Sequence, residues 1–216
     1  MLKHVACLSL VAALSLPGSC AAYQASISKP IPAPPVKFEL SNRTVIDLSI
    51  LGAPIATKEQ CVTYLLAKNP LPYLSVSPQE LVDIFYEEGM IEGIRPDVAF
   101  AQSLHETGFF RYGGDVLPSQ NNYAGLGAIG NSKKGLWFPD ARTGVRAQFQ
   151  HLKAYASVFP PCTPIVDPRY GLVKNSAAFG KAKTWEALNG KWAVPGKTYG
   201  QMILAIHQRI IAINPD

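Results

Sequence analysis

The sequence lacks a hydrophobic run long enough to span a membrane as a helix. Its longest apolar stretch, Val5–Leu16, has about a dozen residues, whereas a spanning helix needs about 20. Lys3 and His4 precede this stretch and small residues follow it at 18–22, which is the pattern of a secretory signal peptide. We therefore predict a signal peptide over residues 1–22, cleaved after its last residue. The protein is then exported to the periplasm, the cell envelope or the extracellular space.

Cysteine is scarce, with four residues in the chain. Cys7 lies in the predicted signal peptide. Cys20 is removed with it or, as an alternative, becomes lipidated, because the small Ser19 before it fits a lipobox. A lipid at Cys20 is the only membrane attachment that we predict. Cys61 and Cys162 remain, and two interpretations stay open: a disulfide formed in an oxidising compartment, or two separate buried thiols.

Several signatures of other protein classes are missing. No Lys/Arg-rich run suggests a nucleic-acid partner, and no C-x-x-C or H-x-x-x-H spacing suggests a metal site. His105, His151 and His207 lack a neighbouring Ser or Cys nucleophile pattern, so we interpret them as packing or surface residues. The segment Gly125–Gly130 matches G-x-G-x-x-G, but loop-like sequence flanks it instead of a strand and a helix. We therefore expect no nucleotide and no cofactor.

The chain has 20 Lys and Arg against 15 Asp and Glu, a net charge of +5 that falls to +4 when residues 1–22 leave with one lysine. Such a mild positive charge suits an acidic polymer or an anionic surface. We interpret residues 23–56 as a proline-rich linker and N-terminal extension, of which Lys29–Pro35 is extended polyproline. Residues 57–216 then form one domain, which we expect to be a monomer.

Helical patterns dominate from residue 57 onward. Two capping boxes, beginning at Thr57 and Ser77, mark helix starts, and apolar spacing marks the helical faces. The predicted helices cover residues 57–68, 77–89, 96–107, 144–158 and 199–213. Between the third and the fourth lies Phe109–Pro139, a long irregular segment rich in glycine and aromatic residues. Because such segments in compact domains are usually functional, we predict a mainly α domain whose irregular segment lines the site.

Glu106 has the most unusual placement of the acidic residues. It lies at the end of the predicted helix 96–107, where the negative end of the helix dipole disfavours a carboxylate. Phe109, Phe110 and Tyr112 follow closely, and burial against their rings would also raise the pKa of Glu106. A carboxylic acid that stays protonated near neutral pH is what the cleavage of a glycosidic bond requires. The alternative is an exposed glutamate at a frayed helix end.

Polar and aromatic residues near Glu106 are candidates for binding sugars. Asparagine and glutamine amides can bind acetamido and hydroxyl groups, aromatic rings stack on sugar rings, and glycines allow a polymer to approach the backbone. For the two asparagines, plain turn chemistry is the alternative. The predicted substrate-binding residues are Gln102, Tyr112, Asn121, Asn122, Tyr123, Trp137 and Trp192.

Five sequence blocks resemble the glucosaminidase domain of peptidoglycan hydrolases, the mannosyl-glycoprotein endo-β-N-acetylglucosaminidase-like group of glycoside hydrolase family 73. The resemblance covers about residues 75–213, and several blocks in the right order make it specific. The blocks are Ala99–Gly108, Phe110–Asp115, Asn121–Gly127, Phe138–Gln148 and Leu188–Gln201.

This resemblance implies a lysozyme-like (α+β) fold and cleavage of β-1,4 glycosidic bonds in peptidoglycan glycan strands by an endo-β-N-acetylglucosaminidase. It implies that Glu106 is the general acid and that Asn121 and Asn122 line the cleft. The late family block usually reads Gly-Tyr-Ala-Thr-Asp-Pro-x-Tyr, and its tyrosine is thought to assist catalysis. Here Trp192 occupies that place, so we expect Tyr199, or otherwise Tyr123, to supply the catalytic hydroxyl.

A second group must stabilise the oxocarbenium-like centre of the reaction. Asp115 and Asp140 are the carboxylate candidates, and the 2-acetamido group of the substrate is a third option. Three alternative functions remain on the same fold. A lytic transglycosylase would leave a 1,6-anhydro end, a muramidase would cut the other linkage of the glycan, and a non-catalytic glycan-binding protein would cut neither.

Overall fold

The computed structural model describes residues 49–128 and 134–214, all of which belong to one compact unit, Ser41–Asp216. The predicted signal peptide, the lipidation site at Cys20 and the polyproline segment lie outside the described residues. None of the described helices combines the length and the apolar character needed to cross a membrane.

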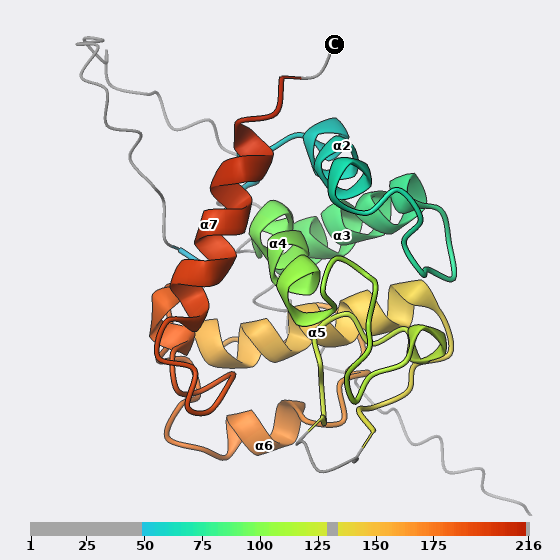
Figure 1. Ribbon diagram of the computed structural model, residues 1–216. Coiled ribbons are helices and arrows are strands. Elements are labelled where there is room, and N and C mark those ends of the chain that lie inside the picture. Colours follow the sequence, from blue (N-terminus) through green and yellow to red (C-terminus); the bar gives the residue numbers. More distant parts are fainter. Residues whose placement is uncertain (1–48, 129–133, 215–216) are drawn as a thin grey trace, which may run out of the picture. The chain divides into compact units, whose positions relative to one another are not determined.

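The described part of the domain is mainly helical, as predicted (Figure 1). Its β structure consists of three isolated bridges, and two short 3-10 turns, η1 (Pro118–Gln120) and η2 (Glu186–Leu188), interrupt the loops. The α-helices are α2 (Lys58–Lys68), α3 (Pro78–Glu92), α4 (Pro96–Glu106), α5 (Ala141–Ala156), α6 (Tyr170–Lys174) and α7 (Tyr199–Ile211).

Local side-chain caps fix where several helices begin. Thr57 and Gln60 form the predicted capping box of α2, and the Ser77 hydroxyl accepts from Glu80 N at the start of α3. α5 begins three residues before the predicted position, because Asp140 Oδ1 accepts from Thr143 N at 2.7 Å and caps the helix. The structure therefore gives Asp140 a capping role, whereas the sequence made it a candidate second carboxylate.

Helix α4 lies at the centre of the domain (Figure 1). Every residue from Pro96 to Leu104 is buried, and the helix packs against α2, α3 and α7. The ring of Phe100 makes an edge contact with Phe85 of α3, with 5.4 Å between the ring centroids. Because α4 is enclosed along its length, the position of its last residue, Glu106, is fixed by the core.

The N-terminal end of α4 is held by a buried carboxylate. Asp97 Oδ2 accepts hydrogen bonds from the backbone N–H groups of Ile55 and Ala56, at 2.8 and 3.0 Å, and lies 2.7 Å from His207 Nε2. Ile50 is completely buried nearby in the sequence. Residues 49–56, which the sequence assigned to the N-terminal extension, therefore pack against the helices of the domain.

The two cysteines of the domain do not pair with each other. Cys61 is a free thiol buried in the core, and its Sγ lies 3.6 Å from the Tyr86 hydroxyl. The disulfide from Cys61 to Cys162 that the sequence left open is therefore wrong, and Cys61 is a buried thiol.

Candidate active site

Glu106 is the last residue of α4, and a left-handed turn follows it directly. Gly108 has a φ of +59°, and Phe109 N donates back to Leu104 O at 2.8 Å, which is a Schellman helix end. Phe109, Phe110 and Tyr112 also have φ values of 56–59°, a conformation that costs non-glycine residues energy. Such strained backbone persists only where surrounding contacts determine it, and it is typical of functional sites.

The phenylalanine rings after Glu106 do not cover its carboxyl, contrary to the sequence prediction. Phe109 packs against Tyr64 of α2, and Phe110 packs against Phe100 of α4 and against Tyr123. The two rings thus anchor the strained turn in the core. The aromatic residues that contact Glu106 come instead from the segment before α7 and from the first residue of α7.

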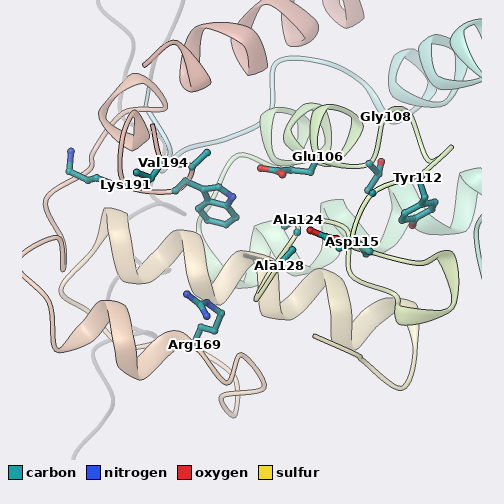
Figure 2. Close-up of a pocket in the computed structure, with 15 residues that line it drawn as sticks. Glu106, Gly108, Tyr112, Asp115, Ala124, Ala128, Arg169, Lys191 and Val194 are labelled. Carbon is teal, nitrogen blue, oxygen red and sulfur yellow. The ribbon is translucent and has the colours of Figure 1, made fainter. Parts of the chain in front are cut away.

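A groove with a volume of about 790 Å³ lies at the end of α4 (Figure 2). Figure 2 shows that the carboxyl groups of Glu106 and Asp115 both reach into this space, while Arg169 lies on its far side. Its volume is within the range of small-molecule sites. The groove is lined by Glu106–Gly108, Tyr112, Gly114–Val116, Ala124, Gly125, Ala128, Arg169 and Lys191–Val194.

Tyr199, the first residue of α7, is hydrogen-bonded to the Glu106 carboxyl. Its hydroxyl donates a hydrogen bond to Glu106 Oε1 and accepts one from Gln102 Nε2 at 2.8 Å. The Trp192 ring stacks on the Tyr199 ring, with 6.5 Å between centroids and 13° between planes. A side chain at Gly200 would place its Cβ 2.3 Å from the carbonyl oxygen of Trp185. Only glycine therefore lets α7 begin close enough to η2 to hold Tyr199 in this position.

Burial raises the pKa of the Glu106 carboxyl to about 7, and hydrogen bonds from Tyr199 and Trp192 oppose this rise. The direction agrees with the sequence prediction, but the largest cause is burial in the folded domain. Burial likewise raises the pKa of the Tyr199 hydroxyl well above its usual value. At neutral pH Tyr199 is therefore a hydrogen-bond donor, and a large fraction of Glu106 carries a proton.

Four of the predicted site residues other than Glu106 lie in or directly behind the groove. Asp115, Tyr112 and Trp192 line it, and Tyr199 contacts the Glu106 carboxyl. Gln102 is completely buried behind Tyr199, so it reaches Glu106 through the tyrosine hydroxyl and not through the groove.

The predicted asparagines are buried and engaged with the protein. The Asn122 side chain is bonded to the backbone of Leu126 in both directions, at 2.8 and 2.9 Å. Asn121 Nδ2 donates to Phe138 O, and its Oδ1 accepts from Ser75. Both amides therefore hold the irregular segment together, which agrees with the turn interpretation instead of the cleft-lining one.

Two further predicted residues do not reach the groove. Tyr123 is buried and donates its hydroxyl hydrogen to Asn121, so it does not supply a hydroxyl to Glu106. Trp137 is 63% exposed but is absent from the groove lining. Within the described residues, no group of three or more His, Cys, Asp or Glu side chains is placed to hold a metal ion.

Sequence reasoning missed several residues that the fold brings to the site. Gly125 has a φ of +64°, and a Cβ there would lie 3.1 Å from Glu106 Oε2. The Asn121–Gly127 block and the rejected G-x-G-x-x-G match both include it, but neither indicates this contact with Glu106. Arg169 lines the groove without any local pattern that marks it, and Lys191 lines it although nothing distinguishes it within the block Leu188–Gln201. Gln148 of α5 is completely buried and donates to Gln102 Oε1, a role that no spacing along the chain reveals.

Comparisons with known proteins cover the same region. The family model described as Glucosaminidase, mannosyl-glycoprotein endo-beta-N-acetylglucosaminidase, matches residues 82–211, which include α4, the irregular segment and α7. A protein of Borreliella burgdorferi described as an uncharacterized protein is 37% identical over 159 residues, which cover 72% of this chain and 74% of that protein. No solved structure matches the chain.

Proposed function

Since the chain belongs to the glucosaminidase family of glycoside hydrolases, we propose that it is an endo-β-N-acetylglucosaminidase that uses Glu106 as its general acid. The family assigns it to the peptidoglycan hydrolases, with a mainly helical, lysozyme-like domain. The environment of the Glu106 carboxyl is the observation that supports its role as the general acid. Glu106 is half-buried at the wall of a groove, has a pKa of about 7 and accepts a hydrogen bond from Tyr199.

In the proposed reaction, the glycan strand lies in the groove beside Gly125. Glu106 gives its proton to the oxygen that links N-acetylglucosamine to the next sugar as the bond from the anomeric carbon to that oxygen breaks. Water then adds to the anomeric carbon and gives a proton to the Glu106 carboxylate, which restores the acid. Hydrogen bonds from Tyr199 and Trp192 to the carboxyl strengthen as it becomes a carboxylate, so they stabilise Glu106 after proton transfer.

The positive centre on the sugar needs a second group. Asp115 is the one other acidic residue in the groove lining, and the 2-acetamido group of the substrate can form an internal ring instead. Replacing Asp115 with Asn separates the two. A loss of several orders of magnitude in kcat assigns the role to Asp115, while retention of most activity assigns it to the acetamido group.

Peptidoglycan as substrate places the protein in the cell envelope or outside the cell. We propose that residues 1–22 direct its export and that lipidation of Cys20 is the alternative to cleavage after Ala22. We further propose that the domain works as a monomer.

The test is product analysis on purified peptidoglycan with the wild type, Glu106→Gln and a control, Glu59→Gln. Glu59 is an exposed residue in the first turn of α2. We expect the wild type and the control to release glycan with a reducing N-acetylglucosamine end, and Glu106→Gln to remain folded and inactive. A reducing muramic acid end would indicate a muramidase, and a 1,6-anhydro end would indicate a lytic transglycosylase. Binding of the wall without cleavage by the wild type would indicate a glycan-binding protein.

A further inference from the structure

A chain of buried hydrogen bonds leads from the core to the Glu106 carboxyl. It begins at Ser103 and passes through Gln148, Gln102 and Tyr199. Ser103 Oγ lies 2.9 Å from Gln148 Oε1, and Gln148 Nε2 lies 2.8 Å from Gln102 Oε1. Gln102 Nε2 lies 2.8 Å from the Tyr199 hydroxyl, which is bonded to Glu106 Oε1. Side chains from α4, α5 and α7 therefore contribute to one continuous chain.

One backbone carbonyl sets the direction of this chain. Gln148 lies 2.9 Å from Ala99 O, and a carbonyl oxygen can only accept, so the amide nitrogen of Gln148 must point toward it. The second N–H of Gln148 then donates to the oxygen of Gln102, which directs the Gln102 nitrogen toward Tyr199. Because Gln102 donates to the tyrosine oxygen, the only hydrogen of the Tyr199 hydroxyl is directed to Glu106.

Water has no access to the middle of this chain. Ser103, Gln102 and Gln148 are completely buried, and Tyr199 is 2% exposed. An amide left without its partner here has no solvent to replace it, so reversing any one bond would leave unpaired donors or acceptors. The bond from Gln148 to Ala99 O therefore fixes the direction of the bonds that lead through Gln102 and Tyr199 to Glu106.

We propose that Gln102 and Gln148 are positioning residues that decide which oxygen of Glu106 carries the transferable proton. They direct the Tyr199 hydroxyl so that Oε1 of Glu106 always accepts a hydrogen bond. The proton of the acid form then resides on Oε2, the oxygen that faces Gly125 in the groove lining. Without this constraint, the carboxyl group could turn its protonated oxygen toward Tyr199 and away from the glycan.

The effect of Gln102 and Gln148 on catalysis rests on the proposed function of Glu106. The hydrogen-bond chain itself does not depend on that function. The ionisable groups around Glu106 are Tyr199 of α7, His105 of α4, whose ring contacts Tyr199, and the groove residues Tyr112, Asp115, Arg169 and Lys191. Helix α5 contributes only the neutral amide of Gln148 to the chain. A change in the Glu106 titration after removal of an amide therefore reports the hydrogen bond from Tyr199, since no charge is lost.

The test uses the whole protein and four variants. Gln102→Met and Gln148→Met remove an amide and keep the length of the side chain. Gln102→Glu replaces a donor with a carboxylate that accepts the Tyr199 hydrogen and so turns the hydroxyl away from Glu106. The matched control is Gln60→Met, because the Gln60 side chain also makes three hydrogen bonds but lies at the far end of α7, with Ile211 and Ile213.

We expect Gln102→Met to lower kcat about tenfold with KM unchanged, which corresponds to about 1.4 kcal/mol. Gln148→Met should have a smaller effect of the same kind, and Gln102→Glu a larger one. Gln60→Met should lose thermal stability without a change in kcat. Wild-type kcat in Gln102→Met, or an equal loss of kcat in Gln60→Met, would overturn the proposal.

A readout that needs no activity separates this inference from the proposed function. The Glu106 carboxyl can be titrated by carbon-13 NMR, with its signal assigned through Glu106→Gln. Because the Tyr199 hydrogen bond lowers the pKa of Glu106, weakening it in Gln102→Met, and to a smaller degree in Gln148→Met, should raise that pKa without any change of charge. If the wild type does not cut peptidoglycan but these rises occur, the proposed function fails and the hydrogen-bond chain stands. An unchanged titration in both methionine variants contradicts the chain itself.

Discussion

The hydroxyl of Tyr199 donates a hydrogen bond to Oε1 of Glu106, although the two residues are 93 positions apart in the sequence. One begins α7 and the other ends α4, so packing of these two helices assembles the acid and its donor. The consequences of this contact for pH dependence, together with those of the surrounding structure, give four predictions.

The first prediction concerns the pH dependence of cleavage. A general acid must be protonated, so kcat/KM should fall about tenfold per pH unit above a pKa of about 7. Tyr199→Phe removes a hydrogen bond that lowers the pKa of Glu106, so this descending limb should move to higher pH, with a lower maximal rate. Measuring initial rates from pH 4 to pH 9 tests both points. A limb that stays in place in Tyr199→Phe would contradict the assignment of that limb to Glu106.

The second prediction concerns stability at the same carboxyl. The pKa of Glu106 is higher in the folded protein than its usual value of 4.5, so the unfolded state loses this proton first. Folding stability should therefore decrease as pH rises from about 4.5 to about 7. Glu106→Gln cannot ionise and should melt at a higher temperature than the wild type at pH 8, with little difference at pH 4. A lower melting temperature of the variant at pH 8 would show that the ionised carboxyl is not disfavoured by the fold.

The third prediction concerns Gly125, which lies beside the Glu106 carboxyl. Gly125→Ala places a Cβ 3.1 Å from Glu106 Oε2 at a φ of +64°, whereas Gly190→Ala has nearly the same φ, +66°, and nothing within 4 Å. Both should lose about 1–2 kcal/mol of unfolding free energy from the left-handed backbone. Only Gly125→Ala should also lose most of its kcat, because its Cβ crowds the proton-donating oxygen. Urea unfolding and rate measurements on both variants separate the two effects, and equal rates in both would exclude crowding.

The fourth prediction concerns the buried carboxylate of Asp97. Burial acts to raise its pKa, but hydrogen bonds from His207 and from the backbone of Ala56 and Ile55 outweigh burial and lower it. This stabilising contribution is present above the usual pKa of about 3.9 and is lost as pH falls through the lower folded value. Asp97→Ala should therefore cost about 3–5 kcal/mol at pH 7, and the difference from the wild type should shrink below pH 3.

Asp83 provides the matched control for Asp97. It too lies 2.7 Å from a basic side chain, that of Lys58, but both partners are more than a third exposed. Exposed pairs contribute little because water screens them, so Asp83→Ala should change the unfolding free energy by less than about 1 kcal/mol. Chemical denaturation of both variants measures the difference, and equal losses would show that burial does not govern these pairs.

Several helix ends could be predicted from the sequence because they depend on contacts between residues close together in the chain. The capping box at Thr57, the side-chain cap at Ser77 and the glycine stop after Glu106 each depend on bonds formed within about one helical turn. The short helix α6 was missed because five residues cannot show a helical period. Asp140 was predicted as a catalytic candidate because the sequence alone does not distinguish an aspartate that caps a helix from one that takes part in catalysis.

The roles of the site residues were harder to predict because they depend on distant contacts. Asn121 and Asn122 resemble sugar-binding amides in sequence, but the fold turns them inward to bind backbone groups. Trp192 and Tyr199, which contact the acid, lie in the last part of the chain. Gln148 has the spacing of an ordinary helix residue, and its bond to Gln102 exists only because α5 crosses α4.

The sequence by itself determined the positions of five helices to within a few residues, that an acidic residue stands at the end of a core helix, and which family the chain resembles. These properties follow from short-range hydrogen bonds, apolar spacing and residue order. Only the tertiary structure decided how far the pKa of Glu106 rises and which oxygen of its carboxyl faces the groove. It also decided that Asn121 and Asn122 stabilise the irregular segment and do not line the groove. These depend on desolvation and on hydrogen-bond partners far away along the chain, and a linear pattern contains neither.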